Sequence, residues 1–412
     1  MTFSSVNAQS IHRLIQRSGI ILCLVSAIAA GGCGGGSSPQ GDGGDHSSAT
    51  EGTLSVALSD TATDEYSAVY VTIARVDVLS SAGASWKTVA DTPKTCNLLE
   101  LVNGEHLPLG ETSLKEGMYS QMRLVLGTEP ATGNNILNEQ HPYPHYTIST
   151  DTDETRELEV PGALSSGIKL ISRFAIHGDE KTGIVIDFDA TRSIIHTGGS
   201  QQILKPVLRT FEPEANATIS GAVRQKASPS EEVERCYISV QQSLGTDEGD
   251  DLIAPVGGTL SSPEGNYSLP LEPGDDYTLV AFKQGYQTQC FNVADPQMDA
   301  TFFLNFSLEK LPTAPGSISG EVTIPGSDMD QPYAAIQVRR HLTCQNENGS
   351  SSNQNVIVKT VNVADRSSYN IELPPGMYQL LATAPENPLI PPILRQINLR
   401  AESELIQHFR LQ

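Results

Sequence analysis

The sequence is poor in several features that mark particular classes of protein. Only 6% of its residues are aromatic, a single tryptophan is present, and 26 basic residues stand against 48 acidic ones. Two of the basic residues and none of the acidic ones precede residue 34, which leaves 24 basic against 48 acidic residues in the rest of the chain. A nucleic acid would be repelled by this charge, and no stretch rich in lysine or arginine interrupts it, so we exclude a nucleic-acid-binding function.

Motifs that carry chemistry are also missing. The chain has no GxSxG, HExxH, P-loop or dinucleotide-binding glycine motif. No cysteine belongs to a CxxC pair, so a zinc ribbon is unsupported. His141 and His145 are four residues apart, but Pro142 and Pro144 prevent the helix that would bring them to one face. These absences favour a protein that is not an enzyme.

Turn-forming residues are abundant instead. The 412 residues include 35 glycines and 25 prolines, with 18% charged residues. This composition favours short strands over long helices, and no window of about a dozen residues shows helical periodicity. At about 100 to 200 residues per domain, the length predicts two to four domains.

Residues 1–33 are typical of an export signal. Two arginines precede an apolar run at residues 20–30, which is too short for a bilayer span of roughly 20 residues. The run leads into Ala-Gly-Gly-Cys at residues 30–33, which resembles the bacterial lipobox, with Ala30 where leucine is usual. The resemblance implies that Cys33 becomes the lipid-modified N-terminus. The alternative is an ordinary secretory signal cleaved near Ala30.

A polar, Gly/Ser-rich stretch at residues 34–52 is expected to form a flexible tether after Cys33. No later hydrophobic run approaches about 18 residues, so the lipid is the only membrane attachment that we expect. Gly34, rather than aspartate, follows the cysteine. By analogy with enterobacterial sorting, this predicts a location at the outer membrane of the cell envelope.

Residues 53–213 are expected to form one β-sandwich domain. Apolar residues alternate from Val69 to Ile73, but the pattern changes phase, because Val76 and Val78 carry it further on. A period of two can change face only through an inserted residue or a bend, so we predict a bulge near Ala74 and Arg75.

Several segments of this region resemble one family, in order along the chain. They are GTLSVALSD at residues 52–60, YSAVYVTIARVDV at 66–78, WKTV at 86–89, LLEL at 98–101, GMYSQMRLVL at 117–126, IVIDFDA at 184–190 and LKPV at 204–207. Over residues 52 to about 212 the chain is thereby similar to the bacterial lipoprotein family known as domain of unknown function 4382. The resemblance implies an envelope location and an architecture, but no catalytic or binding residue.

The second half of the chain contains an internal repeat. TISGAV at residues 218–223 recurs as SISGEV at 317–322, and NYSLPLEPG at 266–274 recurs as YNIELPPG at 369–376. Two copies predict two tandem domains, at residues 216–311 and 316–412. The order of the motifs resembles the carboxypeptidase regulatory-like domain, a small sandwich of the transthyretin or starch-binding type. The second copy departs from it by a polar insert at residues 346–355. The predicted fold is therefore all-β, with three β-sandwich domains in series, the last two transthyretin-like or Ig-like.

Four cysteines follow Cys33, and an exported chain meets an oxidising compartment. Cys236 and Cys290 lie in expected strands of the same domain, so we predict a disulfide between them, closing a loop of 54 residues. The alternative is two buried thiols. The states of Cys96 and Cys344 stay open.

Asp187 and Asp189 are the candidate metal ligands. In a strand their side chains point the same way, with Cα atoms about 6.6 Å apart, and two carboxylates on one edge suit a hard cation such as calcium. The alternative is that arginine or lysine side chains and backbone donors hold them. Other carboxylates cluster in turn-like stretches, at residues 60–65, 151–154 and 247–251.

Phe282 and Tyr286 are the candidate ligand-binding residues. Both lie beside a turn in a domain that resembles starch-binding sandwiches, and sugar sites usually stack sugar rings on exposed aromatic side chains. The alternative is that they pack in the core.

These observations predict a lipid-anchored envelope protein that is a non-catalytic binding or structural module, possible partners being a polysaccharide or an envelope protein. Strand addition to a partner protein is a further option. The alternative is an envelope enzyme or accessory subunit that uses Asp187 and Asp189. A buried acidic pair with shifted pKa values inside a pocket would favour the enzyme. An open polar sheet face would favour the binding module.

Overall fold

The computed structural model describes residues 50–412 apart from residues 84, 151, 163–165, 200, 245–251, 328 and 347. Residues 49–412 make up one compact unit. The export signal, Cys33, most of the tether and the acidic stretch at 247–251 therefore lie outside the described residues. Within them, regular helix is limited to α2 (Ala190–Ser193) and the short 3-10 turns η1 (Leu98–Glu100) and η3 (Pro213–Ala215), so the predicted all-β class is confirmed. None of the helices described there is long and apolar enough to cross a membrane.

The first sandwich packs two sheets face to face. One sheet has the order β5 (Leu107–Lys115), β1 (Glu51–Thr61), β10 (Lys181–Asp189) and β13 (Leu208–Phe211). The other contains β2 (Tyr66–Ser80), β3 (Trp86–Ala90), β4 (Lys94–Asn97), β6 (Gly117–Leu126), β7 (Tyr146–Ser149), β8 (Thr155–Glu159) and β9 (Ile168–Ile176). Alternate residues of β1, such as Leu54, Val56 and Leu58, are fully buried between the sheets. Alternation of apolar residues thus produces the inner face, as expected for a half-buried strand.

The predicted bulge in β2 is confirmed. Ile73 pairs with Leu126 of β6 and Arg75 pairs with Val125, so the register passes over Ala74. After the bulge, Val76 takes the buried position. One strand can therefore keep its apolar residues on the core side along its full length.

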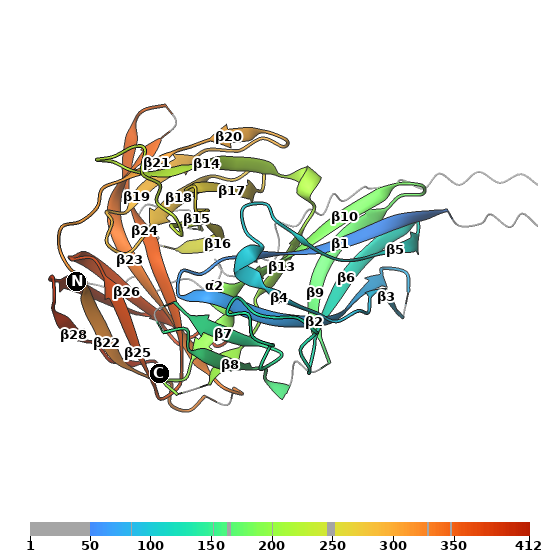
Figure 1. Ribbon diagram of the computed structural model, residues 1–412, viewed down its shortest axis with the longest axis horizontal. Coiled ribbons are helices and arrows are strands. Elements are labelled where there is room, and N and C mark those ends of the chain that lie inside the picture. The colour runs from blue at the N-terminus through green and yellow to red at the C-terminus, as the bar shows by residue number, and fades with distance from the viewer. Residues whose placement is uncertain are drawn as a thin grey trace, which may run out of the picture. The chain divides into compact units, whose positions relative to one another are not determined.

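The repeat builds two further sandwiches. The second places β14 (Ala217–Gln225), β17 (Asn266–Leu271), β20 (Thr301–Phe303) and β21 (Phe306–Leu308) against β15 (Tyr237–Ser243), β16 (Ile253–Leu260), β18 (Tyr277–Phe282) and β19 (Gln289–Val293). The third places β22 (Gly316–Thr323), β25 (Ser367–Leu373), β28 (Glu404–Ile406) and β29 (Phe409–Arg410) against β23 (Tyr333–Asn346), β24 (Ser351–Ala364), β26 (Gly376–Thr383) and β27 (Ile393–Leu399). Figure 1 shows the two groups of strands, in yellow-green to light orange and in orange to red.

A close approach of two backbones explains the glycine of the repeated ISG motif. The first half of β14 pairs in parallel with β20 and its second half with β21, and the chain between β20 and β21 comes very close to β14 at Gly221. A Cβ atom on Gly221 would lie 1.7 Å from the carbonyl oxygen of Leu304. In the third sandwich, a Cβ atom on Gly320 would lie 2.0 Å from the carbonyl oxygen of Gln407. Only glycine lets the two backbones approach this closely.

At this close approach, side chains complete the backbone hydrogen bonds in both copies. The hydroxyl of Tyr267 donates to the Leu304 carbonyl at 2.6 Å, and that of Tyr369 donates to the Gln407 carbonyl at 2.6 Å. Asn305 Oδ1 accepts from the backbone N–H of Ala222 at 2.8 Å. In the other copy, His408 Nδ1 accepts from the backbone N–H of Glu321 at 3.0 Å. The repeated tyrosine and glycine therefore belong to one structural device.

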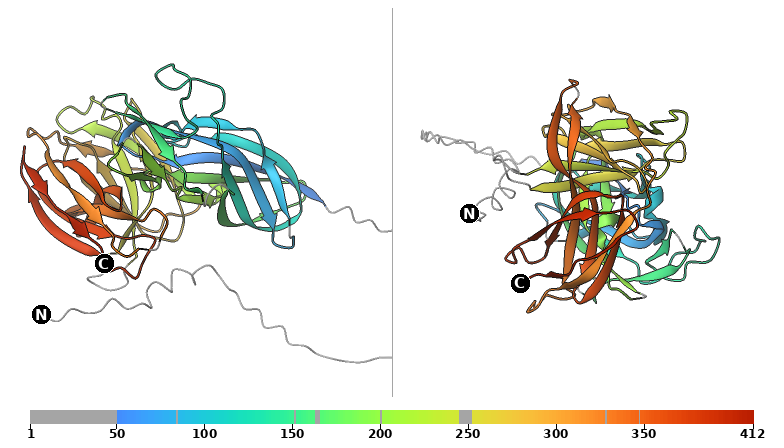
Figure 2. Two further views of the ribbon diagram at one scale, coloured as in Figure 1. Left: turned by 90° about the horizontal axis from the view of Figure 1, so that it is seen from below. Right: turned by 90° about the vertical axis from the view of Figure 1, so that its left-hand side faces the viewer.

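Strand pairing also connects the sandwiches with one another. After the first sandwich's strand β10, β12 (Gln202–Leu204) pairs with β8 of the same sandwich. The preceding strand, β11 (Ile194–His196), forms a parallel bridge with β24 of the third sandwich. From the second sandwich, β19 pairs in parallel with β23 through Phe291 and Asn292. The third sandwich thus contacts both of the others, as both views of Figure 2 show.

We expect Gly221→Ala and Gly320→Ala each to lower the free energy of unfolding by about 3 kcal/mol or more, because the new methyl group overlaps a backbone oxygen that cannot move freely. Urea titration of each variant measures the loss. The matched control is Gly183→Ala in β10, where an added Cβ atom has no neighbour within 4 Å. It should change stability by less than about 0.5 kcal/mol. A Gly221→Ala protein as stable as this control would contradict the explanation.

Candidate functional site

Asp187 is held by an arginine and two hydroxyl groups. It lies in β10 opposite Ser59 of β1, and its carboxylate accepts from Ser59 Oγ at 2.8 Å and Thr61 Oγ1 at 2.9 Å. Arg209 of β13 forms an ion pair with it at 2.8 Å. The residue is only 5% exposed, and these partners occupy both carboxylate oxygens.

Asp189 has a different role at the end of the same strand. Its side chain caps α2, accepting from the backbone N–H of Arg192 at 2.9 Å, and pairs with the Arg192 guanidinium at 2.5 Å. Burial raises the pKa of Asp189 although the guanidinium opposes the shift. The two aspartates thus have separate partners, and the described residues contain no group of three or more ligating side chains that could hold a metal. The geometry gives no support to a calcium site at this pair.

A third carboxylate, Asp60 of the 60–65 cluster, accompanies them, and it lies in β1 and not in a turn. It is 5% exposed, its Oδ1 accepts from the backbone N–H of Ala190 at 3.2 Å, and its Oδ2 has no hydrogen-bond partner among the described residues. Burial, and then the carboxylates of Asp187 and Asp189, raise the pKa of Asp60 well above its usual value. The adjacent cavity, between the first and second sandwiches, measures about 40 Å³. That volume holds a few water molecules and is far below the roughly 300 Å³ of a typical small-molecule site.

Phe282 and Tyr286 do not form an exposed aromatic surface, so that prediction is wrong. Phe282 is 2% exposed and belongs to the hydrophobic cluster of the third sandwich. Tyr286 is half-buried and packs against the core of the second sandwich. The sequence signal was a turn beside an aromatic residue, and it could not show that another sandwich covers the outer face of β18.

The predicted Cys236–Cys290 disulfide is also wrong. Cys290 is bonded to Cys344, with Cα atoms 4.7 Å apart, and Cys236 is a free, buried thiol. β18 lies between β15, which follows Cys236, and β19, which contains Cys290. Two inter-strand spacings make about 10 Å, whereas a disulfide requires Cα atoms within about 7 Å. Burial raises the pKa of the Cys236 thiol, so it is a poor nucleophile.

Alternation along β19 held a signal against the predicted Cys236–Cys290 bond, although it could not identify Cys344 as the partner. Phe291 and Val293 pack on the core of the second sandwich. Cys290 belongs to the cluster of the third sandwich with Val280 and Phe282. Cys236, in contrast, belongs to the cluster of the second. The two cysteines of the predicted bond therefore face opposite sides of one sheet.

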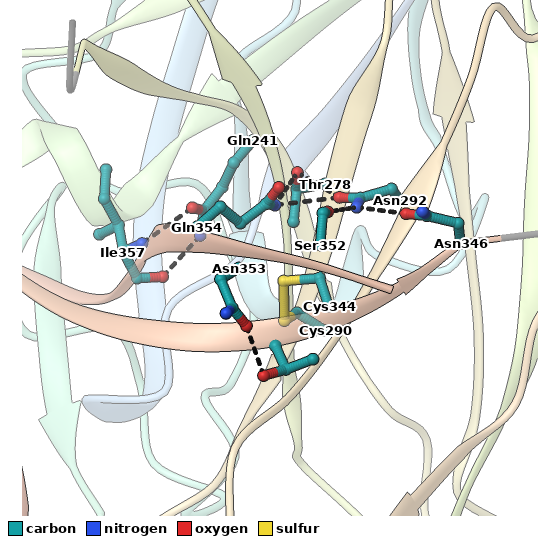
Figure 3. The surroundings of a disulfide bond; sticks show 11 residues. Gln241, Thr278, Cys290, Asn292, Cys344, Asn346, Ser352, Asn353, Gln354 and Ile357 are labelled. Carbon is teal, nitrogen blue, oxygen red and sulfur yellow. Dashed lines mark hydrogen bonds between the residues drawn. A yellow bond between two sulfur atoms is a disulfide. The ribbon is translucent and has the colours of Figure 1, made fainter. Parts of the chain in front are cut away.

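The disulfide lies within a seam of polar side chains between the second and third sandwiches (Figure 3). Asn292 Nδ2 donates to Asn346 Oδ1 at 2.7 Å and to Ser352 Oγ at 2.9 Å. Its Oδ1 accepts from Thr278 at 2.9 Å and from Gln354 Nε2 at 2.9 Å. The polar insert of the second repeat copy is thus the tip of the β23–β24 hairpin, and its side chains hold the two sandwiches together.

Gln241 extends this seam toward the centre of the molecule (Figure 3). The side chain is 1% exposed. Its Oε1 accepts from the backbone N–H of Ile357 at 2.8 Å, and its Nε2 donates to the Ile357 carbonyl at 2.5 Å. A buried amide that reproduces a backbone pairing in this way fixes the register between β15 and β24.

A polar pocket of about 440 Å³ lies where all three sandwiches meet. Lys359 of β24 pairs there with Asp64 at 3.4 Å and with Glu65 at 3.6 Å. Glu65 also contacts His196 Nε2 at 3.2 Å, while Nδ1 of the same ring lies 3.4 Å from Gln202. Burial alone would raise the pKa of Glu65, but Lys359 and His196 bring it down to about 2. Both ring nitrogens of His196 are engaged, so the ring is not positioned as a free general base.

Comparison with known protein families identifies a domain in one part of the chain. Residues 51–206 match the family model of a domain of unknown function, DUF4382, which confirms the resemblance found in the sequence and covers less than half of the chain. No curated protein matches the chain.

Three similar solved structures have low identity and low TM-scores. The Bacillus anthracis TIE protein is 11% identical with a TM-score of 0.20, over 88% of this chain and 51% of that one, so the chain spans about half its length. The Streptococcal ancillary pilin is 13% identical with a TM-score of 0.20, and the match covers 88% of this chain and 99% of the pilin chain. The shaft pilin SpaA from Lactobacillus rhamnosus GG is 8% identical with a TM-score of 0.20, and the match covers 47% of this chain and 97% of the pilin chain. TM-scores this low establish no common fold over the full chain, and we draw no functional conclusion from them.

In a body of residues 50–412, we expect two thiols, Cys96 and Cys236, to be alkylated after denaturation without reductant, and four after reduction. Breaking the Cys290–Cys344 bond by Cys344→Ala should lower the free energy of unfolding by about 4 kcal/mol, because the bond closes a loop of 54 residues. Intact mass and peptide mapping test the pairing, and urea titration tests the loss. Cys96→Ala is the control. Failure of Cys236 to react before reduction would contradict the observed pairing.

We expect Glu65→Gln to destabilise the protein at neutral pH by on the order of 2–3 kcal/mol. The pKa of Glu65 in the folded protein, about 2, lies below its usual value of 4.5. The stabilisation is therefore complete above about pH 4.5 and disappears as the pH falls toward 2. Urea titrations of wild type and variant between neutral and acid pH measure the difference. Glu159→Gln, at an exposed position, serves as control. A difference that does not shrink in acid would argue against this charge cluster.

Proposed function

We propose that the chain is a lipid-anchored, non-catalytic binding or structural module of the bacterial cell envelope. The observation that carries the proposal is the Cys290–Cys344 disulfide, which joins two sandwiches of a chain whose first 33 residues are typical of an export signal. Stable disulfides form outside the reducing cytoplasm. The bond and the sequence of the signal therefore support the same compartment by independent arguments.

The environment of the titratable groups supports the non-catalytic part of the proposal. Asp187 and Asp189 are a buried acidic pair, which is the feature that would favour an enzyme. Each is paired with an arginine, and the cavity lined by Asp187 is too small for a substrate. The polar pocket around Glu65 is larger, but its histidine is fully engaged. These groups serve to connect strands and sandwiches.

The connections between the sandwiches support a structural role. Lys205 Nζ of the first segment donates to the carbonyls of Asp330 and Gln331 at 3.0 and 2.9 Å and pairs with Glu386 at 2.9 Å. Asn103 Nδ2 donates to the Leu260 carbonyl at 2.8 Å. With the disulfide and the pairing of β19 with β23, such contacts make one body of three sandwiches, which suits a spacer or a platform of fixed geometry. We further propose that the two repeat copies are sandwiches of the carboxypeptidase regulatory-like type.

Carbohydrate binding is the weaker part of the proposal. Its supporting feature is a pocket of about 540 Å³ whose lining includes the amide side chains of Asn292, Asn348 and Gln354. The lining contains one aromatic residue, Tyr277, which is 5% exposed. A sugar-stacking surface is therefore missing from this pocket.

Labelling with radioactive palmitate in a bacterial host tests the anchor. We expect the wild-type chain to incorporate label and to sediment with membranes, because Cys33 is the predicted site of lipid attachment. Cys33→Ala should incorporate none. Cys23→Ala, which removes a cysteine of the apolar run, is the matched control and should label like wild type. An unlabelled wild-type protein that is exported and folded would overturn the lipid-anchored part of the proposal.

A further inference from the structure

The outward face of four strands in the first sandwich differs in charge from the rest of the chain. Its outward positions carry the basic side chains of β2, β6 and β9, namely Arg75, Arg123, Lys169 and Arg173, and the acid Asp77. The chain as a whole has a net charge of -22. We call the outward-facing residues of β2, β3, β6 and β9 the basic face.

The pairing registers arrange this face in two rows across the sheet. One row runs from Lys169 through Arg123 and Asp77 to Thr88. The neighbouring row runs from Ile171 through Gln121 and Leu79 to Trp86. A polar row with two basic residues and one acidic residue therefore lies beside a row that is mostly apolar.

The apolar row is accessible, and it contains the one tryptophan of the sequence. Ile171 is 86% exposed although it lies in the middle of a strand, and Met118 at the start of β6 is 52% exposed. Trp86 and Leu79 are half-buried. Amphipathic rings beside basic side chains are typical of surfaces that contact the interface of a membrane.

The charges of the basic face are only partly neutralised. Arg75 and Arg123 share Asp77, at 3.2 and 2.6 Å, and the Arg123 guanidinium also lies 4.7 Å from the centre of the Trp86 ring. Lys169 and Arg173 are exposed, and among the described residues neither forms an ion pair. At physiological salt the Debye length is about 8 Å, so acidic groups elsewhere on the body are largely screened from a surface that touches this face.

The start of the described chain lies at the end of these strands. The carbonyl of Thr50 accepts from the backbone N–H of Glu116, which directly precedes β6, and the Glu51 carbonyl accepts from Asp179, just after β9. Figure 1 shows β3, β6 and β9 at the same end of the body as the start of β1. Thr50 lies seventeen positions after Cys33, a stretch of chain that spans at most about 60 Å. A lipid on Cys33 would therefore keep this end of the body near the bilayer.

We infer that the basic face docks on the surface of a bilayer that contains anionic phospholipid. Lys169 and Arg173 contact the headgroups, while Ile171 and the edge of Trp86 enter the interfacial region. The inference rests on the proposed lipid anchor for proximity to the bilayer. It goes beyond the anchor because it fixes the orientation of the body and leaves the second and third sandwiches free of the lipid surface.

Vesicle binding by the body of residues 50–412 tests the inference, since residues 49–412 are a compact unit by themselves. We expect cosedimentation with vesicles of phosphatidylcholine and phosphatidylglycerol, weak or absent binding to phosphatidylcholine alone, and loss of binding at about 1 M salt, where the Debye length is about 3 Å. Emission of Trp86 should shift to shorter wavelength on binding. As the sequence has one tryptophan, the shift reports contact at this face.

Substitutions locate the contact. Each basic residue near an anionic surface contributes about fivefold in affinity, so Lys169→Gln with Arg173→Gln should weaken binding about 25-fold. Lys310→Gln with Arg400→Gln removes the same charge from exposed positions of the other two sandwiches and should have little effect. Ile171→Ser should reduce binding and the emission shift together.

Three outcomes would overturn the inference: no binding by a folded body to anionic vesicles at low salt, equal binding by the two double variants, or binding without any change in Trp86 emission. The vesicle assay does not use Cys33. If the body does not bind vesicles, lipid attachment is still tested separately by palmitate labelling. Lack of label, in turn, leaves vesicle binding by this face unaffected.

Discussion

The pairing of β19 with β23 is the contact on which the arrangement of this protein depends. It involves only two residue pairs, Phe291 with Gln345 and Asn292 with Asn346, and a pairing this short is weak when isolated. The Cys290–Cys344 bond lies directly before it, and the side chain of Asn292 uses its full hydrogen-bonding capacity in the seam. The disulfide and the fully hydrogen-bonded amide of Asn292 therefore stabilise a strand pairing that two backbone-paired residues alone would not hold.

The same seam explains why buried polar groups are common in a chain with few charged residues. Gln241, Arg339 and Asn362 are each less than 5% exposed. Gln241 and Asn362 bond backbone groups of a different sandwich from their own. A buried amide without partners is costly, so these side chains tolerate only one arrangement of the sandwiches. Specific hydrogen bonds, more than the amount of apolar surface, thus define how the sandwiches pack.

Charged groups follow the same rule in the first sandwich. Asp77, Asp187 and Asp189 are almost fully buried, and each is satisfied by an arginine from its own or a neighbouring element. Asp60 is the exception, because one oxygen has no partner and its raised pKa reflects that environment. Asp187 and Asp189, which look like ligands in the sequence, therefore connect neighbouring strands and cap α2. Lys169 and Arg173 point outward from the basic face and form no ion pair with another described residue.

The sequence by itself determined the features that depend on local pattern. Alternation of apolar residues predicted the all-β class and the bulge at Ala74, because a strand has two faces and can exchange them only through an extra residue. The repeat predicted two similar sandwiches, and its glycine and tyrosine are explained by the close approach of a backbone carbonyl to the glycine. Only the tertiary structure decided the partner of Cys290, the burial of Phe282 and the partners of Asp187. In each case the outcome depends on what covers the outer face or edge of a sheet. Alternation along one strand shows that such a face exists, but the element that packs on it comes from residues far away in the chain.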